Sequence, residues 1–264
     1  MKIIVCMKQV PNTNEVRLDP VTGTLIRDGV PSIINPDDKA GLEAALQLKD
    51  KYGAEVHVVS MGPLQADSAL REALAMGADY AYLVTDKAFG GADTWATSST
   101  VAGAIRNLAP FDLVIAGRQA IDGDTAQVGP QIAEHLGLPN LSYAEEIDVD
   151  PAAGTVTVKR QFDHCEQVVQ AKMPCLVTTL MELNQPRYMT PGGIFAAYRE
   201  KKVTVWNRPD IQVADGDIGL SGSPTKVVKS FPKALKPAGE KAAFDSAEEA
   251  ADAIVAHLKE KFVL

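Results

Sequence analysis

The fold follows from one stretch of the sequence, Phe111-Asp112-Leu113-Val114-Ile115-Ala116-Gly117-Arg118-Gln119-Ala120-Ile121-Asp122-Gly123-Asp124-Thr125-Ala126-Gln127-Val128-Gly129-Pro130. Its apolar run, Leu113 to Ala116, is typical of a strand that is buried on both faces. After a polar turn that contains Gly117 and Gly123, the pattern predicts a helix that stops at Gly137-Leu138-Pro139. The first amides of a helix have no internal partner, and the helix dipole favours negative charge beside them. This order of strand, turn and helix therefore predicts an anion site in an α/β protein.

The polar side chains of this turn allow two interpretations. Asp124 followed by Gln127 fits a capping box, in which side chains satisfy the first amides of the helix and no ligand is needed. A loop that only connects two elements, however, has no need of so many hydrogen-bonding groups, namely Arg118, Gln119, Asp122, Asp124, Thr125 and Gln127. Arg118 could bind a phosphate through two hydrogen bonds, and Asp122 or Asp124 could accept from ribose hydroxyls. The second interpretation predicts a nucleotide without saying which one.

Composition excludes several classes of protein. At 264 residues the chain can bury a large core, and its 46% hydrophobic and 23% charged residues are ordinary for a globular protein. The net charge of −8 argues against a nucleic-acid partner, because no cluster of Lys and Arg could neutralise a phosphate backbone. The sequence contains no membrane-length apolar run and no secretory signal, and its three cysteines are scattered. These features predict a cytoplasmic protein with reduced thiols, no metal site and no membrane partner.

The sequence before Phe111 alternates strand-length and helix-length patterns. Strands are predicted at Ile3–Met7, Val56–Ser60 and Tyr80–Val84, with a small hairpin at Val16–Arg27. Helices are predicted from Asn35-Pro36 to near Tyr52-Gly53, from about Gln65 to Met76, and after Gly90-Gly91-Ala92-Asp93-Thr94 to about Leu108. Such alternation is typical of a doubly wound, mostly parallel sheet, in which ligands bind at the carboxyl ends of the strands.

The pattern changes after Ser142. An antiparallel extension of the sheet is predicted from four strand-length segments, Ala144–Val149, Thr155–Arg160, Cys165–Lys172 and Cys175–Leu180. Residues 207–242 are poor in core patterning and contain several prolines, which predicts an extended arm, and Ser246 then caps a final amphipathic helix. We therefore assign residues 1–206 to the nucleotide-binding domain and residues 207–264 to an arm with a C-terminal helix. The arm either docks on a partner subunit or wraps back on its own domain.

Motifs of several well-known site types are absent. Neither the dinucleotide fingerprint G-x-G-x-x-G nor the phosphate loop G-x-x-x-x-G-K-[ST] occurs, and the four histidines have no ligand spacing. One further segment, Gly90-Gly91-Ala92-Asp93-Thr94-Trp95-Ala96-Thr97, opens a helix after a strand. Asp93 is predicted to cap that helix, while Thr94 and Thr97 share a face and could hydrogen-bond a ligand held against its first turn. Nothing in the sequence predicts a catalytic site that works by itself.

Taken together, these residues resemble the beta subunit of electron-transferring flavoproteins. The resemblance extends over nearly the whole chain, with the motifs in the same order. The motifs that carry it are Val5–Pro11, Asp28-Gly29-Val30, Asn35-Pro36, Met61-Gly62-Pro63, Ala73–Asp79, Gly117–Gly129, Val158-Lys159-Arg160 with Met173-Pro174, and Leu183–Tyr188.

The resemblance implies a heterodimer with an alpha subunit that holds a FAD of its own, and an adenine nucleotide bound at the strand ends of the beta subunit. Carried over by motif, the pocket would comprise Cys6, Asn35, Pro36, Asp37, Asp38, Met61, Gly117, Arg118, Gln119, Ala120, Ile121, Asp122, Gly123, Asp124, Thr125, Ala126, Gln127 and Val128. These positions agree with the independent interpretation, because they follow strands or begin helices.

The identity of the nucleotide distinguishes two branches of the family. In many members it is a structural AMP, whereas in the electron-bifurcating branch it is a second FAD that takes a hydride from NADH. The segments Asp122–Gly129 and Gly90–Thr97 resemble the bifurcating members, so we predict FAD with Thr94 and Thr97 near the flavin. The resemblance then implies electron transfer towards an acyl-CoA dehydrogenase-type flavoprotein and a low-potential acceptor such as ferredoxin. Because the redox chemistry belongs to the cofactor, the sequence leaves open whether the chain counts as an enzyme.

The resemblance also implies two partner surfaces. Residues 183–201 correspond to the loop that recognises the partner dehydrogenase, although Pro191 and Gly192 depart from the mitochondrial proteins. Ile194 and Phe195 are candidate apolar anchors, and Arg199, Lys201 and Lys202 could steer an acidic partner. The alternative is that Phe195 packs internally and the charges are only solvated. The arm, residues 207–264, would dock on the alpha subunit.

Two other classes of protein were compared with this one. A free-standing nucleotide-binding stress-type module would share the sheet but would have no use for the antiparallel extension or the arm. An enzyme that adenylates or cleaves a small substrate on the same fold should carry a glycine- and serine-rich pyrophosphate loop after its first strand. Lys8-Gln9-Val10-Pro11-Asn12 is not such a loop.

Overall fold

The computed structural model describes residues 1–12, 31–228, 238, 239 and 241–264. It divides into two units, Met1–Val228 and Lys229–Leu264, which we treat separately. The hairpin predicted at Val16–Arg27 lies outside the described residues. No helix in the described part of the chain has the length and apolar character needed to cross a membrane.

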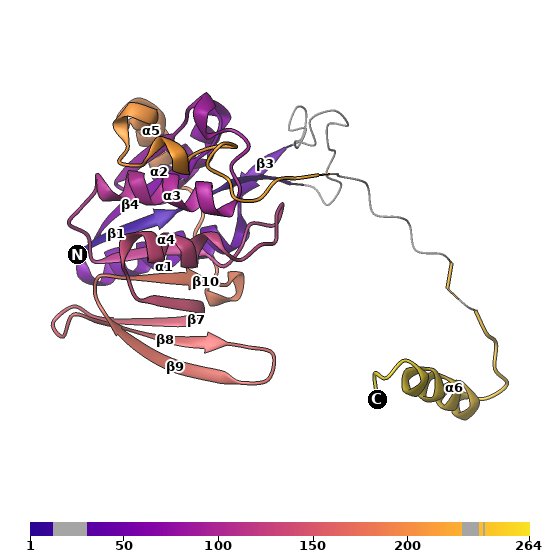
Figure 1. Ribbon diagram of the computed structural model, residues 1–264. Coiled ribbons are helices and arrows are strands. Elements are labelled where there is room, and N and C mark those ends of the chain that lie inside the picture. The colour runs from indigo at the N-terminus through magenta and orange to yellow at the C-terminus, as the bar shows by residue number, and fades with distance from the viewer. Residues whose placement is uncertain (13–30, 229–237, 240) are drawn as a thin grey trace. The chain divides into compact units, whose positions relative to one another are not determined.

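The first unit is built on a nine-stranded sheet, which confirms the predicted fold class (Figure 1). Seven strands run parallel, in the spatial order β11 (Val203–Trp206), β5 (Tyr80–Val84), β4 (Glu55–Met61), β1 (Lys2–Cys6), β6 (Leu113–Gly117), β10 (Cys175–Thr179) and β7 (Asn140–Asp150). β8 (Thr155–Gln161) and β9 (Glu166–Lys172) continue the sheet in antiparallel pairing. A separate antiparallel pair is formed by β2 (Gln9–Pro11) and β3 (Ser32–Ile34).

The antiparallel extension is narrower than predicted. β10 enters the sheet between β6 and β7 and is parallel to both. All five of its residues are buried, as a central parallel strand requires. The segment 175–180 therefore belongs to the parallel part of the sheet. Residues 144–150 of β7 pair antiparallel with β8, as predicted, and β8 pairs antiparallel with β9.

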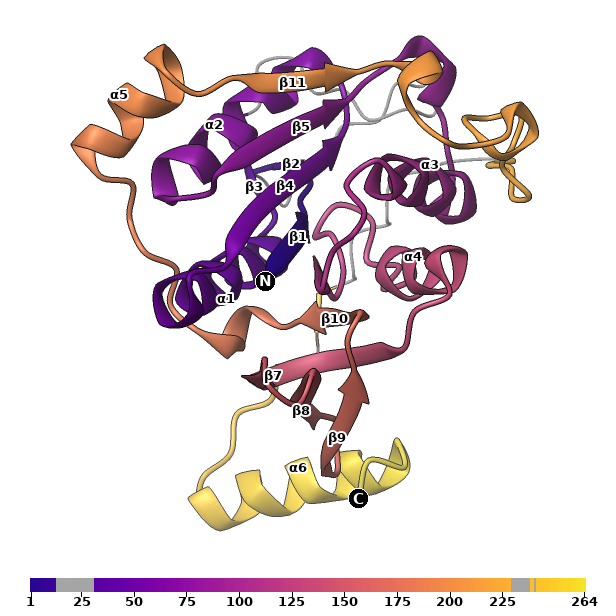
Figure 2. The same cartoon turned by 90° about the vertical axis from the view of Figure 1, so that its left-hand side faces the viewer.

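Helices cover both faces of the sheet, as the doubly wound pattern requires (Figure 2). α1 (Pro36–Tyr52) and α2 (Asp67–Met76) lie on one face, and α3 (Thr94–Arg106) and α4 (Val128–Leu136) lie on the other. Successive residues of β1 consequently face different helices: Ile3 packs in one apolar cluster with Leu42 and Leu70, whereas Ile4 packs in the other with Ile105. α5 (Pro191–Arg199) packs beside α2. Short 3₁₀ turns complete the first unit at Leu64–Ala66, Lys87–Phe89, Met181–Leu183, Arg208–Asp210 and Asp215–Asp217.

The first unit extends beyond the predicted boundary at Trp206. Ile211 and Ile218 are buried in the cluster that contains Ile105. The backbone of Gln212 also lies close to α3, so that a Cβ added to Gly103 would stand 2.9 Å from the Gln212 carbonyl oxygen. Residues 207–228 are thus part of the compact unit, and the division falls after Val228. Their apolar residues are too sparse to show a period in the sequence.

The second unit contains α6 (Ala247–Glu260). The Ser246 hydroxyl accepts a hydrogen bond from the Glu249 amide at 3.2 Å, which confirms the predicted cap. No residue of this helix is buried, although it carries Ile254, Val255 and Leu258. An amphipathic helix whose apolar stripe is uncovered gains little from its own unit, because most helix stability in proteins comes from packing.

Candidate functional site

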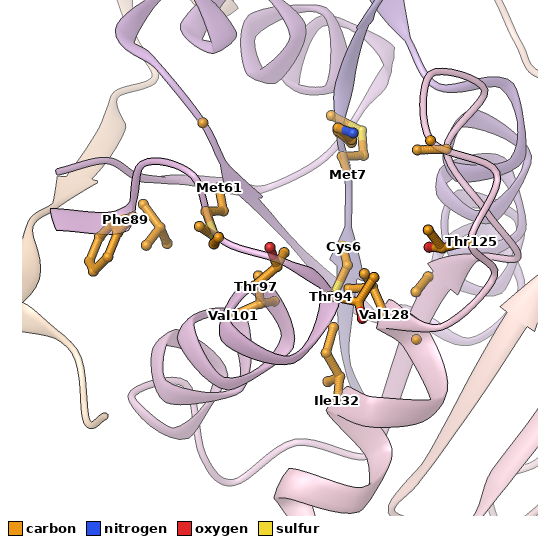
Figure 3. A pocket seen from close by; sticks show the side chains of 18 of the residues that line it. Cys6, Met7, Met61, Phe89, Thr94, Thr97, Val101, Thr125, Val128 and Ile132 are labelled. Carbon is orange, nitrogen blue, oxygen red and sulfur yellow. The ribbon is translucent and has the colours of Figure 1, made fainter. Parts of the chain in front are cut away.

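A cavity of about 930 Å³ lies at the carboxyl edge of the parallel strands (Figure 3). It is bounded by the ends of β1, β4, β5 and β6, by the first turns of α3 and α4, and by residues 117–128. We call residues 117–128 the nucleotide loop, after the ligand that the sequence predicts there. The predicted site residues that line it are Cys6, Asp38, Met61, Thr94, Thr97, Gly117, Arg118, Gln119, Ala120, Gly123, Asp124, Thr125, Ala126, Gln127 and Val128. Five predicted site residues do not line the cavity, namely Asn35, Pro36, Asp37, Ile121 and Asp122. Of these, Asn35 and Asp37 bind the backbone of the loop on the side away from the cavity.

Two glycines allow a strand and a helix to approach each other closely at this edge of the sheet. A Cβ added to Gly117 would stand 2.1 Å from the Asp38 Oδ1 atom, and a Cβ added to Gly129 would stand 2.6 Å from the Thr178 Cγ2 atom. Neither distance is sterically possible. The end of β6 therefore rests directly on the first turn of α1, and the first turn of α4 rests on β10.

Asp38 joins two strand ends below the cavity. Its Oδ2 atom accepts from the Lys8 amide at 2.8 Å, and its Oδ1 atom accepts from the Gly117 amide at 2.9 Å. Burial nevertheless raises the pKa of this carboxyl to about 7. Burial, and then the neighbouring Asp38, raise the pKa of the Cys6 thiol to about 12, so Cys6 is a protonated apolar wall and not a nucleophile.

Asn35 and Asp37 position the nucleotide loop from behind. The Asn35 side chain donates to the Gln119 carbonyl at 2.7 Å and accepts from the Ile121 amide at 3.1 Å. Asp37 accepts from the Gln119 amide at 3.4 Å and lies 3.5 Å from the Nε atom of Arg118. Burial raises the pKa of Asp37, while Arg118 opposes that shift. These side chains determine the course of the loop and leave its front surface open to the cavity.

Asp122 and Asp124 have partners within the protein. The Asp122 carboxylate pairs with the Lys8 ammonium at 2.6 Å, and its side chain is only 8% exposed. The Asp124 carboxylate accepts from the Gln119 side-chain amide at 3.0 Å. Asp122 therefore contributes to the loop's shape and does not line the cavity.

The capping box predicted for α4 is wrong. Asp124 and Ala126 both have positive φ, 51° and 52°, so the backbone at Asp124 cannot reach the capping position. α4 begins at Val128 after Gln127, whose side chain makes no capping hydrogen bond. The Gln127 Oε1 atom instead accepts from the Thr94 hydroxyl at 3.1 Å. Within the described residues, the amides of Val128 and Gly129 have no acceptor, and both residues line the cavity. This helix start therefore presents two amides without an acceptor beside the cavity, an arrangement that suits an anion.

The first turn of α3 forms the opposite wall. Asp93 accepts from the Ala96 amide at 3.0 Å, which confirms the predicted cap. Thr94 and Thr97 lie along the same side of α3 as Val101, toward the cavity (Figure 3). Beyond them the wall is apolar and includes Met61 and Phe89.

Several lining residues were not predicted from the sequence. Those that follow the ends of β4 and β5, such as Gly62, Pro63, Thr85 and Asp86, could have been found from the rule that ligands bind at strand ends. Thr225 could not, because its amide and hydroxyl bind Asp93, at 3.0 and 2.7 Å, across 132 positions of sequence.

The raised pKa of Asp38 predicts a pH dependence of stability. Between about pH 4 and about pH 7 the native carboxyl holds its proton and the unfolded one does not, so the free energy of unfolding falls as pH rises. The Asp38 contribution is at most about 1.4 kcal/mol per pH unit. We expect the stability of the wild type relative to Asp38→Asn, from urea unfolding at several pH values, to decrease over this range.

Asp148→Asn is the matched control, because the Asp148 side chain is 78% exposed, pairs with Lys51 and does not line the cavity. Its stability should follow the wild-type curve. Parallel curves for the wild type and Asp38→Asn would show that Asp38 does not titrate in this range.

Comparison with known proteins identifies the family of this chain. The family model described as "Electron transfer flavoprotein domain" matches residues 22–211. The electron transfer flavoprotein subunit beta of Clostridium acetobutylicum is 57% identical over 262 residues, 99% of each chain. Caffeyl-CoA reductase-Etf complex subunit CarD of Acetobacterium woodii is 53% identical over 265 residues, 100% of each chain. The electron transfer flavoprotein subunit beta of Megasphaera elsdenii is 46% identical over 270 residues, 100% of this chain and 98% of that one. The chain therefore belongs to the electron transfer flavoprotein family, among its beta subunits.

Proposed function

We propose that this beta subunit holds a FAD in the cavity described above. The observation that carries the proposal is the continuity of the cavity from the nucleotide loop to the apolar wall at Phe89. Its volume of about 930 Å³ stands near the upper end of the roughly 300–1,000 Å³ that small-molecule pockets span. A dinucleotide suits this size, whereas AMP would occupy only the part beside the loop.

The residues present fit the two halves of FAD. The free amides of Val128 and Gly129 would receive the pyrophosphate, together with Arg118, whose Nε atom has no hydrogen-bond acceptor within the described residues. Thr94 and Thr97 would hydrogen-bond the flavin end, and the apolar wall would exclude water from the ring. Cys6, Asp38 and Met61 would line the nucleotide between these ends.

We propose that the subunit belongs to the electron-bifurcating branch. FAD when bound supplies the redox chemistry, which is to accept a hydride from NADH and pass electrons to an acyl-CoA dehydrogenase-type flavoprotein and to a low-potential acceptor such as ferredoxin. The likeness to a subunit of a caffeyl-CoA reductase-Etf complex supports an assembly with a reductase. The chain's own part is to bind and orient the cofactor. Its place of action would be the cytoplasm.

Two surfaces would bind protein partners. The second unit would dock α6 and its exposed apolar residues on the alpha subunit.

The segment 183–201, which contains α5, would dock on the dehydrogenase through Tyr188, Ile194 and Phe195, which are exposed. Phe195 is 60% exposed, which excludes the alternative that it packs internally. Lys201 is not available for steering, because its ammonium group donates to the Ala78 carbonyl at 2.5 Å. Arg199 lies over the Phe195 ring, 5.2 Å from its centre.

The direct test is to co-express this chain with its alpha subunit and count the FAD and AMP released per heterodimer on denaturation. We expect two FAD and no AMP, because the alpha subunit holds one FAD and the cavity here has room for another. One FAD with one AMP would replace this proposal with a simple electron carrier in which the nucleotide of this subunit is structural.

A double variant tests the placement of the flavin. Thr94→Ala with Thr97→Ala should weaken FAD retention in this subunit about tenfold, the effect of losing about 1.4 kcal/mol of hydrogen bonding. Ultrafiltration followed by flavin absorbance would measure the loss. Thr204→Ala is the matched control, because Thr204 is exposed on β11 and does not line the cavity. Equal flavin content in the double variant and the control would mean that the hydroxyls do not contact FAD.

The dehydrogenase surface yields a separate prediction. Phe195→Ala should weaken the affinity for a dehydrogenase that the complex reduces by about 30-fold, as expected when an aromatic anchor worth about 2 kcal/mol is lost. Stability should change by less than about 0.5 kcal/mol, because the side chain is exposed. The control is Val168→Ala, which removes an exposed apolar side chain from β9. A Phe195→Ala protein with wild-type affinity in titration calorimetry would place the anchor elsewhere.

A further inference from the structure

α1 holds two parts of the chain that are far apart in sequence. Its first turn is hydrogen-bonded to the nucleotide loop through Asn35, Asp37 and Asp38. Asp37, Ala40 and Glu43, spaced three residues apart, form a stripe on α1 that contacts residues 181–187. Figure 2 shows this segment running past α1 on its way from β10 to α5.

The stripe fixes residues 181–187 at three points. The Asp37 Oδ1 atom accepts from the Met181 amide at 3.1 Å, and the Ala40 carbonyl accepts from the Asn184 side chain at 2.9 Å. Glu43 is buried and accepts from both the backbone amide and the guanidinium of Arg187, at 3.0 and 2.8 Å. α5 begins soon afterwards at its cap, Thr190. The position of the partner-facing surface therefore depends on α1.

Asp37 is the residue in which the two sets of contacts meet. Its Oδ1 atom contacts Met181, whereas its Oδ2 atom accepts from the Gln119 amide and lies 3.5 Å from Arg118 Nε. The contact with Arg118 is an ion pair too long for a good hydrogen bond. Arg118 also lines the cavity, so it stands between a carboxylate behind the loop and any anion in front of it.

A bound phosphate would change this balance. A phosphate accepts two parallel hydrogen bonds from a guanidinium, which is a stronger arrangement than the long pair with Asp37. Asp37 is 5% exposed and would then depend on the amides of Gln119 and Met181 to stabilise its charge. Both hydrogen bonds should tighten, and the one to Met181 would hold residues 181–187 more firmly.

We propose that the Asp37 carboxylate couples nucleotide occupancy to the position of residues 181–187, and through them to the surface of α5. Asp37 is in this sense a positioning residue, because it acts on the ligand through Arg118 and on the partner surface through Met181. The inference rests on the proposed function in one respect, namely that a nucleotide occupies the loop. By linkage, partner docking should in turn strengthen nucleotide binding by the same factor.

The test is amide hydrogen exchange of the heterodimer, stripped of nucleotide and then reloaded with FAD or with AMP. We expect the amides of residues 181–187 to exchange about fivefold more slowly in the loaded wild type, the lower end of common coupling factors. Exchange in residues 117–128 reports loading in the same experiment. An unchanged exchange rate at 181–187 in loaded wild-type protein would by itself overturn the coupling.

Two variants break the link at its two ends. Asp37→Asn places a side-chain NH₂ group or an uncharged oxygen where the carboxylate accepts from Gln119 and Met181. Met181→Pro removes the amide that Asp37 binds, at a helix start that accepts proline and after an extended Leu180. Each should retain slower exchange at 117–128 on loading and lose it at 182–187.

Asp50→Asn is the matched control, since Asp50 contacts Arg187 at 2.9 Å but does not touch the nucleotide loop. It should keep the wild-type response. A response that persists in both Asp37→Asn and Met181→Pro, or that disappears in Asp50→Asn, would contradict a path through Asp37. A heterodimer whose beta subunit retains neither FAD nor AMP would contradict the proposed function instead.

Discussion

The site depends on one buried carboxylate, Asp38, which binds the backbone at the carboxyl ends of both β1 and β6. Its two oxygens accept the amides of Lys8 and Gly117, and the contact with Gly117 is possible only because that residue has no side chain. In a parallel sheet the amides beyond the strand ends have no ladder partner, so a carboxylate between them serves two donors at once. The nucleotide loop begins at this point, and its direction follows from it.

An acidic chain can build an anion site when its carboxylates already have hydrogen-bond donors or cations within the protein. Around the nucleotide loop, Asp38 is occupied by two amides, Asp122 by Lys8, and Asp124 by the Gln119 side chain. Asp38 and Asp124 line the cavity with these donors in place, beside the side chains of Lys8 and Arg118. The first amides of α4, which have no acceptor within the described residues, lie at the same cavity. The local potential at the loop thus depends on helix and backbone dipoles and on the cations of Lys8 and Arg118 as well as on the nearby carboxylates, and does not follow from the net charge of −8.

The sequence was sufficient for the parts of the site that depend on local rules. An apolar run that ends in Gly117 predicts a strand end, and Asp93 before Thr94 predicts a helix cap, because both depend on neighbouring residues alone. The insertion of β10 between β6 and β7 was not predictable, since a fully buried run does not reveal its pairing partners. The Asp124 cap failed for a similar reason: the loop turns at Asp124 with positive φ, where Gln119 and not the helix provides the partner. The positions of Thr225, which binds Asp93, and of Ile211, which packs in the cluster of Ile105, depend on residues more than a hundred positions apart in sequence.

The predicted site residues at the start of α1 fall into two groups, because some contact the cavity and others contact the loop beside it. Asp38 touches the cavity and sets the strand ends, whereas Asn35 and Asp37 never line the cavity but direct the loop. When the motif Asn35 to Asp38 is transferred from the family as a whole, all of its residues are taken to be ligand contacts. Physically, the residues behind the loop can matter as much, because a donor placed by a buried, hydrogen-bonded neighbour keeps its orientation without a ligand and loses less entropy when the ligand binds. The buried position of Asp37 between Arg118 and Met181 gives that support a second role, because the same carboxylate binds the loop and the segment that leads to α5.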